Sequence, residues 1–235
     1  MAVSKRTFVD ESDKTVEISV IIPLVESETM LKDLLDDLSL ITNVSEVILS
    51  IAKEGSNQET KLSFDSFSKI YPFEIRTVES PKGRARQLNR GAKESKNEYL
   101  WFIHADSRVH LNPSKTNLRS NALNYGRLKF FGSPRLLMKL NETGVYFRCK
   151  FWGMPFGDQG FLIKRKFFDS LSGFNELVSF GECHEFAWRC RKNGILILEA
   201  GFEIKTSSRK YDQNGWLKTS LFHIFHTFKQ TFQFR

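Results

Sequence analysis

The sequence predicts an α/β fold with a mostly parallel central sheet flanked by helices. Short apolar runs rich in β-branched and aromatic residues recur through the first half of the chain, at 18–23, 47–49, 73–78 and 98–103. Amphipathic stretches separate these runs, and such alternation indicates βαβ units with parallel neighbouring strands. A chain of 235 residues with 40% hydrophobic content can bury a proper core, so a single domain is the simplest organisation.

The chain begins with a polar segment, a strand and a helix. Residues 1–15 are polar and charged and are predicted to form a flexible N-terminus, ahead of a single domain that spans 16–235. The run Ile18–Pro23 is predicted to be the first core strand, and Pro23 closes it. The helix that follows has either Ser27 or Thr29 as its N-cap. Its apolar positions share one face: Leu31, Leu34, Leu35, Leu38 and Ile41.

The next elements continue the alternation. A second strand begins at Val47, a short helix is expected within 60–70, and a third strand spans Phe73–Val78. Gly83–Ser95 is predicted to be a helix that leads into the strand at 98–103. From 112 to 155 glycines and prolines interrupt the pattern. We therefore expect a regular first half and a looser second half that is more specific to the substrate.

Charge and cysteine content narrow the class of partner. Thirty-five Lys and Arg against 27 Asp and Glu give a net charge of +8, which suits a nucleotide diphosphate, a lipid phosphate or a nucleic acid. Nucleic-acid binding ranks below the others, because no base-stacking motif is interleaved with the cations. The three cysteines form no disulfide framework, and neither a signal peptide nor a bilayer-spanning run is evident. A cytoplasmic location is expected.

Two polar side chains follow the most apolar strand. The run Tyr99–Ile103 ends abruptly in His104-Ala105-Asp106. In open α/β sheets ligands bind at the carboxyl ends of strands, and an Asp there can hold a divalent cation against phosphate oxygens. For His104 two interpretations stay open: ligation of Mn²⁺, which imidazole suits better than Mg²⁺, or a hydrogen bond that orients the strand end. A solvated turn is the alternative for the whole triplet.

Three blocks of sequence carry a family resemblance. The segment 81–109, PKGRARQLNRGAKESKNEYLWFIHADSRV, resembles the family 2 glycosyltransferases of GT-A fold, and within them a small bacterial subgroup with H-A-D in place of D-x-D. The block Phe156–Gly160, FGDQG, resembles the F-G-D-Q strand on the family's acceptor side. Ser207–Tyr211, SSRKY, is similar to its closing segment. The resemblance covers about residues 17–220.

The resemblance implies a GT-A-like fold that transfers a sugar, a hexosyl group, from a nucleoside diphosphate sugar to a hydroxyl acceptor, with inversion and with a divalent cation, Mn²⁺ or Mg²⁺. The amino-terminal half would hold the donor and the carboxyl-terminal half the acceptor, which could be a glycan, a lipid-linked molecule or a small molecule. The implied donor residues are Pro23, Glu54, Arg84, Arg86, Gln87, Asn89, His104 and Asp106, of which Asp106 and His104 would hold the metal. The implied acceptor residues are Gly157, Asp158 and Gln159, and Asp158 is also a catalytic candidate.

The sequence departs from the family pattern at two positions. No Asp follows the second strand, and Glu54 is the available substitute for the family's base-contacting residue. At the position of the family's catalytic base stands Cys183, whose thiol is a poor general base at neutral pH. Glu182 and Glu185 therefore become the candidates; alternatively, both carboxylates only complement a helix dipole. The alternative function is that of a catalytically degenerate protein, which has the same fold and binds sugar nucleotides without turnover.

The C-terminal tail, from Trp216 to Phe232, reads as an aromatic helix with interspersed cations. Such a helix can lie in a lipid interface, which would place the protein at the inner face of the membrane. The alternative is a contact with the core or with a second copy.

Overall fold

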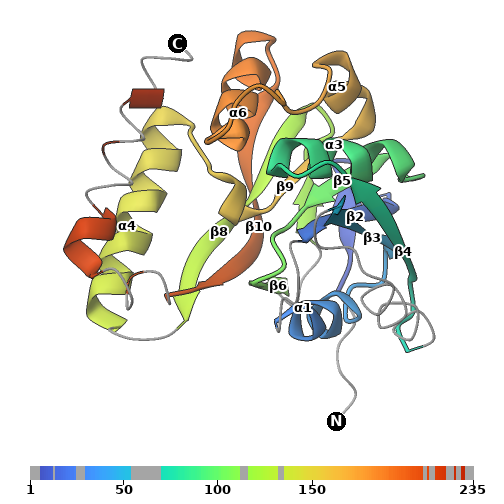
Figure 1. Ribbon diagram of the computed structural model, residues 1–235, viewed down its shortest axis with the longest axis horizontal. Coiled ribbons are helices and arrows are strands. Elements are labelled where there is room, and N and C mark those ends of the chain that lie inside the picture. Colours follow the sequence, from blue (N-terminus) through green and yellow to red (C-terminus); the bar gives the residue numbers. More distant parts are fainter. Residues whose placement is uncertain are drawn as a thin grey trace.

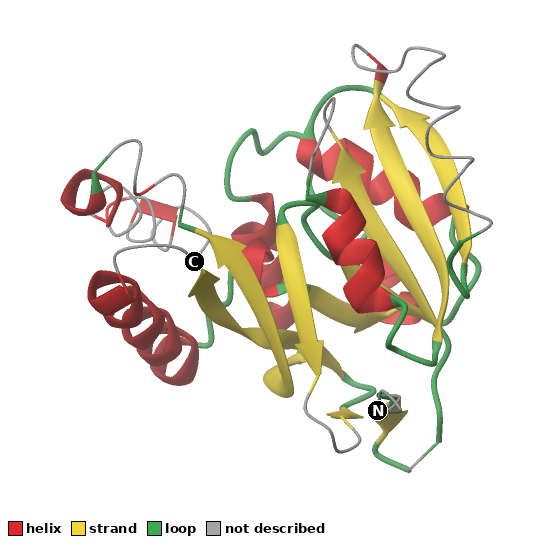
Figure 2. Cartoon of the chain, turned by 90° about the horizontal axis from the view of Figure 1, so that it is seen from below, coloured by secondary structure: helices red, strands yellow, loops and turns green. Residues whose placement is uncertain are grey.

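The structure is a computed structural model, and it describes residues 6–12, 14–24, 30–53, 70–111, 116–131, 135–208, 211, 215–220, 225 and 229–230. Within these residues an eight-stranded sheet has the order β4-β3-β2-β5-β9-β8-β10-β6. Helices flank the sheet, with α4 and β4 at opposite ends of the molecule (Figure 1). Seen from below, the sheet twists along its width (Figure 2). The α/β class predicted from the sequence is confirmed.

The first half of the sheet is parallel. Strands β2 (Ile18–Leu24), β3 (Val44–Ala52), β4 (Glu74–Ser80) and β5 (Tyr99–Phe102) pair in parallel. Helix α1 (Leu31–Leu38) and helix α3 (Arg84–Glu94) cover opposite faces (Figure 1). Val20 and Ile22 of β2 pack with the α1 leucines, whereas Ile21 between them packs with Ala85 and Leu88 of α3. The strand is apolar apart from Ser19, because both of its faces are covered.

The second half of the sheet is mixed. Strand β9 (Phe161–Lys164) lies antiparallel between β5 and β8 (Ala122–Phe131). Strand β10 (Leu196–Ser207) runs parallel to β8 and antiparallel to β6 (Ser107–Leu111). The described residues of this half include the helices α4 (Arg135–Trp152), α5 (Arg165–Ser170) and α6 (Glu182–Lys192). No helix in the described part of the chain combines the length and apolar character needed to cross a membrane.

The expectation of an irregular segment from 112 to 155 is wrong, because a ten-residue strand and an eighteen-residue helix, β8 and α4, occupy most of it. The sequence pattern did not predict helix α4, for a physical reason. Of its apolar side chains only Met138 and Cys149 are buried, while Leu136, Phe147 and Phe151 are exposed. Apolar side chains thus occur on the buried as well as the exposed side of α4, so the whole helix shows no single apolar face opposite a polar one.

The expectation of a flexible N-terminus is wrong for β1 (Phe8–Asp10). This strand pairs in parallel with β7 (Thr116–Leu118). Phe8 is fully buried, and its ring packs edge-on against Trp101 and Phe202, with centroids 5.1 and 5.7 Å away. Because the first fifteen residues are mostly polar, the sequence did not predict that Phe8 is buried.

Phe8→Ala should therefore destabilise the whole domain. Removal of a fully buried Phe typically costs about 3–5 kcal/mol in the free energy of unfolding. Urea denaturation followed by circular dichroism measures that loss. Lys14→Ala, at an exposed position of the same terminus, is the control and should stay within about 0.5 kcal/mol of wild type. Equal stability of Phe8→Ala and wild type would show that the terminus does not belong to the core.

Candidate active site

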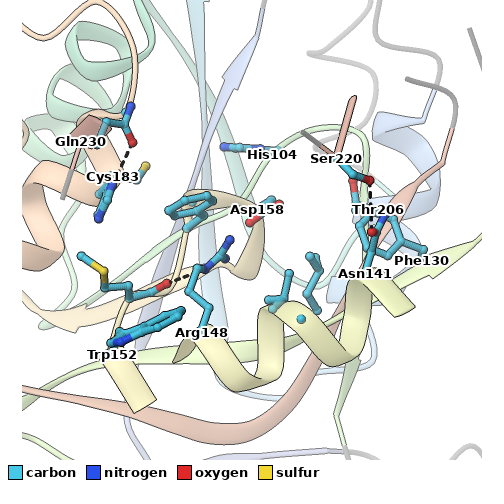
Figure 3. Close-up of a pocket in the computed structure, with 18 of the residues that line it drawn as sticks. His104, Phe130, Asn141, Arg148, Trp152, Asp158, Cys183, Thr206, Ser220 and Gln230 are labelled. Carbon is cyan, nitrogen blue, oxygen red and sulfur yellow. Dashed lines mark hydrogen bonds between the residues drawn. The ribbon is translucent and has the colours of Figure 1, made fainter. Parts of the chain in front are cut away.

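A cavity of about 1260 Å³ lies where strand ends meet α4 and the start of α6. Figure 3 shows Asp158 and His104 in this cavity, with Arg148 extending from α4 on the side of Asp158. The polar residues that line it near those strand ends are Arg84, His104, Asp106, Asp158, Glu182 and Cys183. These six come from four separate segments, so the fold brings together residues that lie up to 99 positions apart, from 84 to 183, in the sequence.

A tight turn presents His104 and Asp106. The amide of Ile103 still donates to the Ile21 carbonyl at 3.1 Å, and the amide of Ser107 then donates back to the His104 carbonyl at 3.2 Å. The chain therefore turns directly after its last hydrogen bond to β2. The side chains of His104 and Asp106 both line the cavity. One carboxylate and one imidazole suit Mn²⁺ with diphosphate and water as its other ligands. No group of three or more metal-ligating side chains is preassembled among the described residues.

The start of α3 supplies a cation. Gly83, the N-cap, has φ +133°, which side chains rarely adopt, and Arg84 follows it. The Arg84 guanidinium lines the cavity, is half exposed, and lies 3.4 Å from Oε1 of Glu182. Free N–H groups at a helix start add to its attraction for phosphate. Arg86, two residues later, pairs with Glu176 at 3.8 Å and does not line this cavity.

Two other residues of the same block make structural contacts. Gln87 is buried, and its amide donates to the carbonyls of Leu24 and Ser50 at 2.7 and 2.8 Å, which joins the ends of β2 and β3. Asn89 donates to the Phe174 carbonyl and accepts from the Phe174 amide, both at 2.8 Å. Both side chains position the donor half, and neither lines the cavity. Their assignment as donor contacts stays a prediction.

The FGDQ block forms a short turn beside α6. Gly157–Gln159 is a 3₁₀ turn. A Cβ at Gly157 would lie 2.5 Å from Sγ of Cys183, so only glycine allows this close approach. Gln159 is buried and donates to the Gly126 carbonyl at 3.1 Å, while Asp158 lines the cavity. Of the three predicted acceptor residues, Asp158 is the one with a charged side chain at the cavity.

The two glutamates at the start of α6 have different surroundings. Glu185 pairs with Arg189, at 2.6 Å to Nε and 2.8 Å to Nη2, and lines a separate pocket of about 400 Å³. Glu182 is 4% exposed and lines the main cavity. Besides Arg84, it contacts the Cys183 thiol, which lies 3.8 Å from the same Oε1. The geometry therefore favours Glu182 over Glu185 as a group that could take a proton in the cavity.

Burial, followed by the neighbouring Glu182 carboxylate, raises the pKa of the Cys183 thiol well above its usual value. The thiol is therefore protonated at neutral pH and cannot serve as a general base. Cys183→Ala should change any transfer rate by less than about ten-fold, against the 10²–10⁴-fold typical of a lost base. Steady-state rates of the variant measure this, and a loss as large as that of a base would contradict the assignment. Alkylation by iodoacetamide at pH 8 should likewise be slow in the folded protein.

Sequence reasoning missed the residues that α4 and the C-terminal part contribute. The Arg148 guanidinium lies 3.6 Å from the centre of the Phe156 ring and donates to the Met154 carbonyl at 3.0 Å. Tyr211 also lines the cavity, and burial, with Asp158 close by, raises its pKa to about 12. The signal that could have found α4 is the helical spacing of Leu136, Leu140, Phe147 and Phe151.

Some predicted residues lie outside the described part of the chain: Ser27, Thr29, Glu54, the helix within 60–70 apart from its last residue, Arg209, Lys210 and most of the tail after 220. Pro23 is described, pairs with Ser50 across β2 and β3, and does not line the cavity.

Comparison with known proteins gives a family similarity over part of the chain and a shared fold. Residues 19–114 match the family model described as glycosyl transferase family 2. No curated protein sequence matches the chain. Among solved structures, TarS from S. aureus superposes with a TM-score of 0.54 at 16% identity, over 82% of this chain and 37% of that one. A structure of TarS 1-349 gives 0.56 at 14% identity, over 82% of this chain and 60% of that one.

A third similar structure is the mannosyltransferase PcManGT from Pyrobaculum calidifontis, in complex with GDP-Man and Mn²⁺. Its TM-score is 0.52 at 16% identity, over 79% of this chain and 57% of that one. The chain thus spans 37% to 60% of the length of these three structures, and at these identities the likeness concerns the fold. Over residues 19–114 the chain is therefore similar to glycosyl transferase family 2, and its fold resembles that of these three structures.

Proposed function

We propose that the chain transfers a hexosyl group from a nucleoside diphosphate sugar to a hydroxyl acceptor, with inversion at the anomeric carbon. The observation that carries this proposal is that Arg84, Asp106, Asp158 and Glu182 line one cavity. Cationic and metal-ligating groups lie on the donor side, and a carboxylate lies within the same space. Those are the two requirements of a displacement in which a diphosphate leaves and a hydroxyl attacks.

Glu182 acts as the general base. The acceptor hydroxyl gives its proton to the Glu182 carboxylate as its oxygen forms a bond to the anomeric carbon. The bond between that carbon and the diphosphate oxygen breaks, and its electron pair stays on the diphosphate. Arg84 and Cys183 both contact Oε1 of Glu182, and among the described residues no hydrogen bond engages Oε2. Oε2 is therefore the oxygen that takes the proton, and Asp158 orients the acceptor by accepting a hydrogen bond.

Asp106 and His104 would hold a divalent cation, Mn²⁺ or Mg²⁺, which neutralises charge on the departing diphosphate. Arg84 adds a fixed positive charge at the start of α3. Because Mn²⁺ accepts imidazole more readily than Mg²⁺ does, the His104 ring favours Mn²⁺. The net charge of +8 further suits an anionic donor. We place the reaction in the cytoplasm, with peripheral contact to the inner face of the membrane.

The competing proposal is a sugar-nucleotide-binding protein without turnover, and the protonated Cys183 at the family's base position favours it. Calorimetry with UDP- and GDP-hexoses, each with and without Mn²⁺, tests the shared part of both proposals. We expect a donor to bind with Mn²⁺ and weakly without it. Slow hydrolysis of that donor then separates the two, since water can replace the acceptor in an active site that has its base. Absence of binding by every donor would contradict both proposals.

A further inference from the structure

Helix α4 carries a row of exposed apolar side chains. Leu136 is 80% exposed, Leu140 58%, Phe147 48% and Phe151 68%. The spacing of these four positions, i, i+4, i+11 and i+15, places them on one face of the helix. Such a row on an exposed helix face needs a covering partner or ligand.

The same face forms part of the wall of the active-site cavity. Leu140 and Phe147 line the cavity, as does Trp152 at the end of α4. Other apolar residues extend this wall toward Asp158 and Glu182: Val145, Met154, Phe156, Phe180 and Trp188. An apolar wall offers no partners for the hydroxyl groups of a sugar chain, and a buried polar group without a partner is costly. This part of the cavity therefore suits a hydrocarbon chain.

Gly144 opens a path along this face. It lies at i+4 from Leu140 and three residues before Phe147, and it lines the cavity. A Cβ built there meets no atom within 4 Å. Glycine inside a helix is unfavourable relative to alanine, so packing does not explain its presence. The missing side chain leaves a gap in an otherwise apolar row.

We propose that the acceptor is an amphiphile. Its hydroxyl-bearing head lies at Asp158 and Glu182, and its apolar chain runs over Gly144 along α4 to the exposed end of the row. The inference rests on the proposed function, because it assigns the acceptor of that reaction. The cavity volume of about 1260 Å³ exceeds the roughly 300–1,000 Å³ of ordinary small-molecule sites, and so leaves room for a chain beside the donor.

Methyl, hexyl, heptyl and octyl β-glucosides, kept below their micellar concentrations, are suitable probes. Three tryptophans, Trp152, Trp188 and Trp216, line the cavity, so intrinsic fluorescence reports binding without any turnover. We expect affinity to rise by about two- to four-fold for each methylene that the wall buries. Affinity that does not depend on chain length would overturn the inference.

Gly144→Phe fills the gap and should weaken octyl glucoside binding by ten-fold or more. Lys139→Phe places the same ring on another side of α4, at an exposed position, and is the matched control that should leave the affinity unchanged. Equal affinity of Gly144→Phe and wild type would reject the chain path. Nucleotide-sugar binding, measured in parallel, distinguishes the two proposals. If the donor binds but glucoside affinity does not depend on chain length, this inference alone is rejected. If no donor binds, the proposed function is rejected.

Discussion

Glu182→Gln should lower the rate of sugar transfer by about 10²–10⁴-fold, which is the usual contribution of a general base. The substitution keeps the size of the side chain and its contact with Arg84, but it removes the ability to take a proton. Donor affinity should stay within a few-fold of wild type. The measurement is the transfer or hydrolysis rate with whichever sugar nucleotide binds, together with calorimetry for the donor.

Glu185→Gln provides the comparison for that experiment. Glu185 carries the same charge three positions later, but it faces Arg189 and the smaller pocket. We expect it to lower stability, because Arg189 loses a buried charged partner, and to leave most of the activity of the folded protein. A larger loss of rate in Glu185→Gln than in Glu182→Gln would reverse the assignment of the base.

The second large effect is expected at Asp106. Asp106→Asn removes the carboxylate that would hold the cation, and metal-dependent nucleotide binding should weaken by about 10²-fold or more, since even outer-shell partners of a metal typically contribute 10–100-fold. Titration of the donor at several Mn²⁺ concentrations measures the change. Binding without Mn²⁺ should hardly differ between variant and wild type.

An Asp→Asn substitution outside the cavity controls for the effect of net charge on binding. Asp169 lies exposed in α5 and outside the cavity, so Asp169→Asn should leave Mn²⁺-dependent binding unchanged. If both variants lose affinity equally, then net charge governs the binding and Asp106 has no local role.

The first half of the fold was predictable because its apolar runs obey simple periodicities. Ile18–Leu24 is apolar apart from Ser19 because both faces of β2 are covered, and the α1 leucines repeat at helical spacing. Helix α4 was harder to predict, since its apolar residues lie on its buried as well as its exposed side. The buried Phe8 was missed because a single apolar anchor within polar sequence produces no period.

The candidate site was predictable in its types of residue and less so in their roles. Asp106, Asp158 and Glu182 line one cavity, and their roles there stay predictions. Gln87 and Gln159, from the same motifs, instead bind backbone carbonyls inside the fold. A motif records which polar residues are present, and only the three-dimensional arrangement distinguishes an amide that completes the backbone hydrogen bonding from one that faces a ligand.

The contact of Asn89 with Phe174 joins helix α3 of the first half to the loop that precedes α6 in the second half. These two segments are 85 positions apart in sequence, yet the Phe174 amide cannot open without breaking its bond to the Asn89 side chain. Amide hydrogen exchange at Phe174 should therefore be as slow as in α3, and Asn89→Ala should release it. Helix α3 and the loop before α6 would then open as one cooperative unit rather than as two.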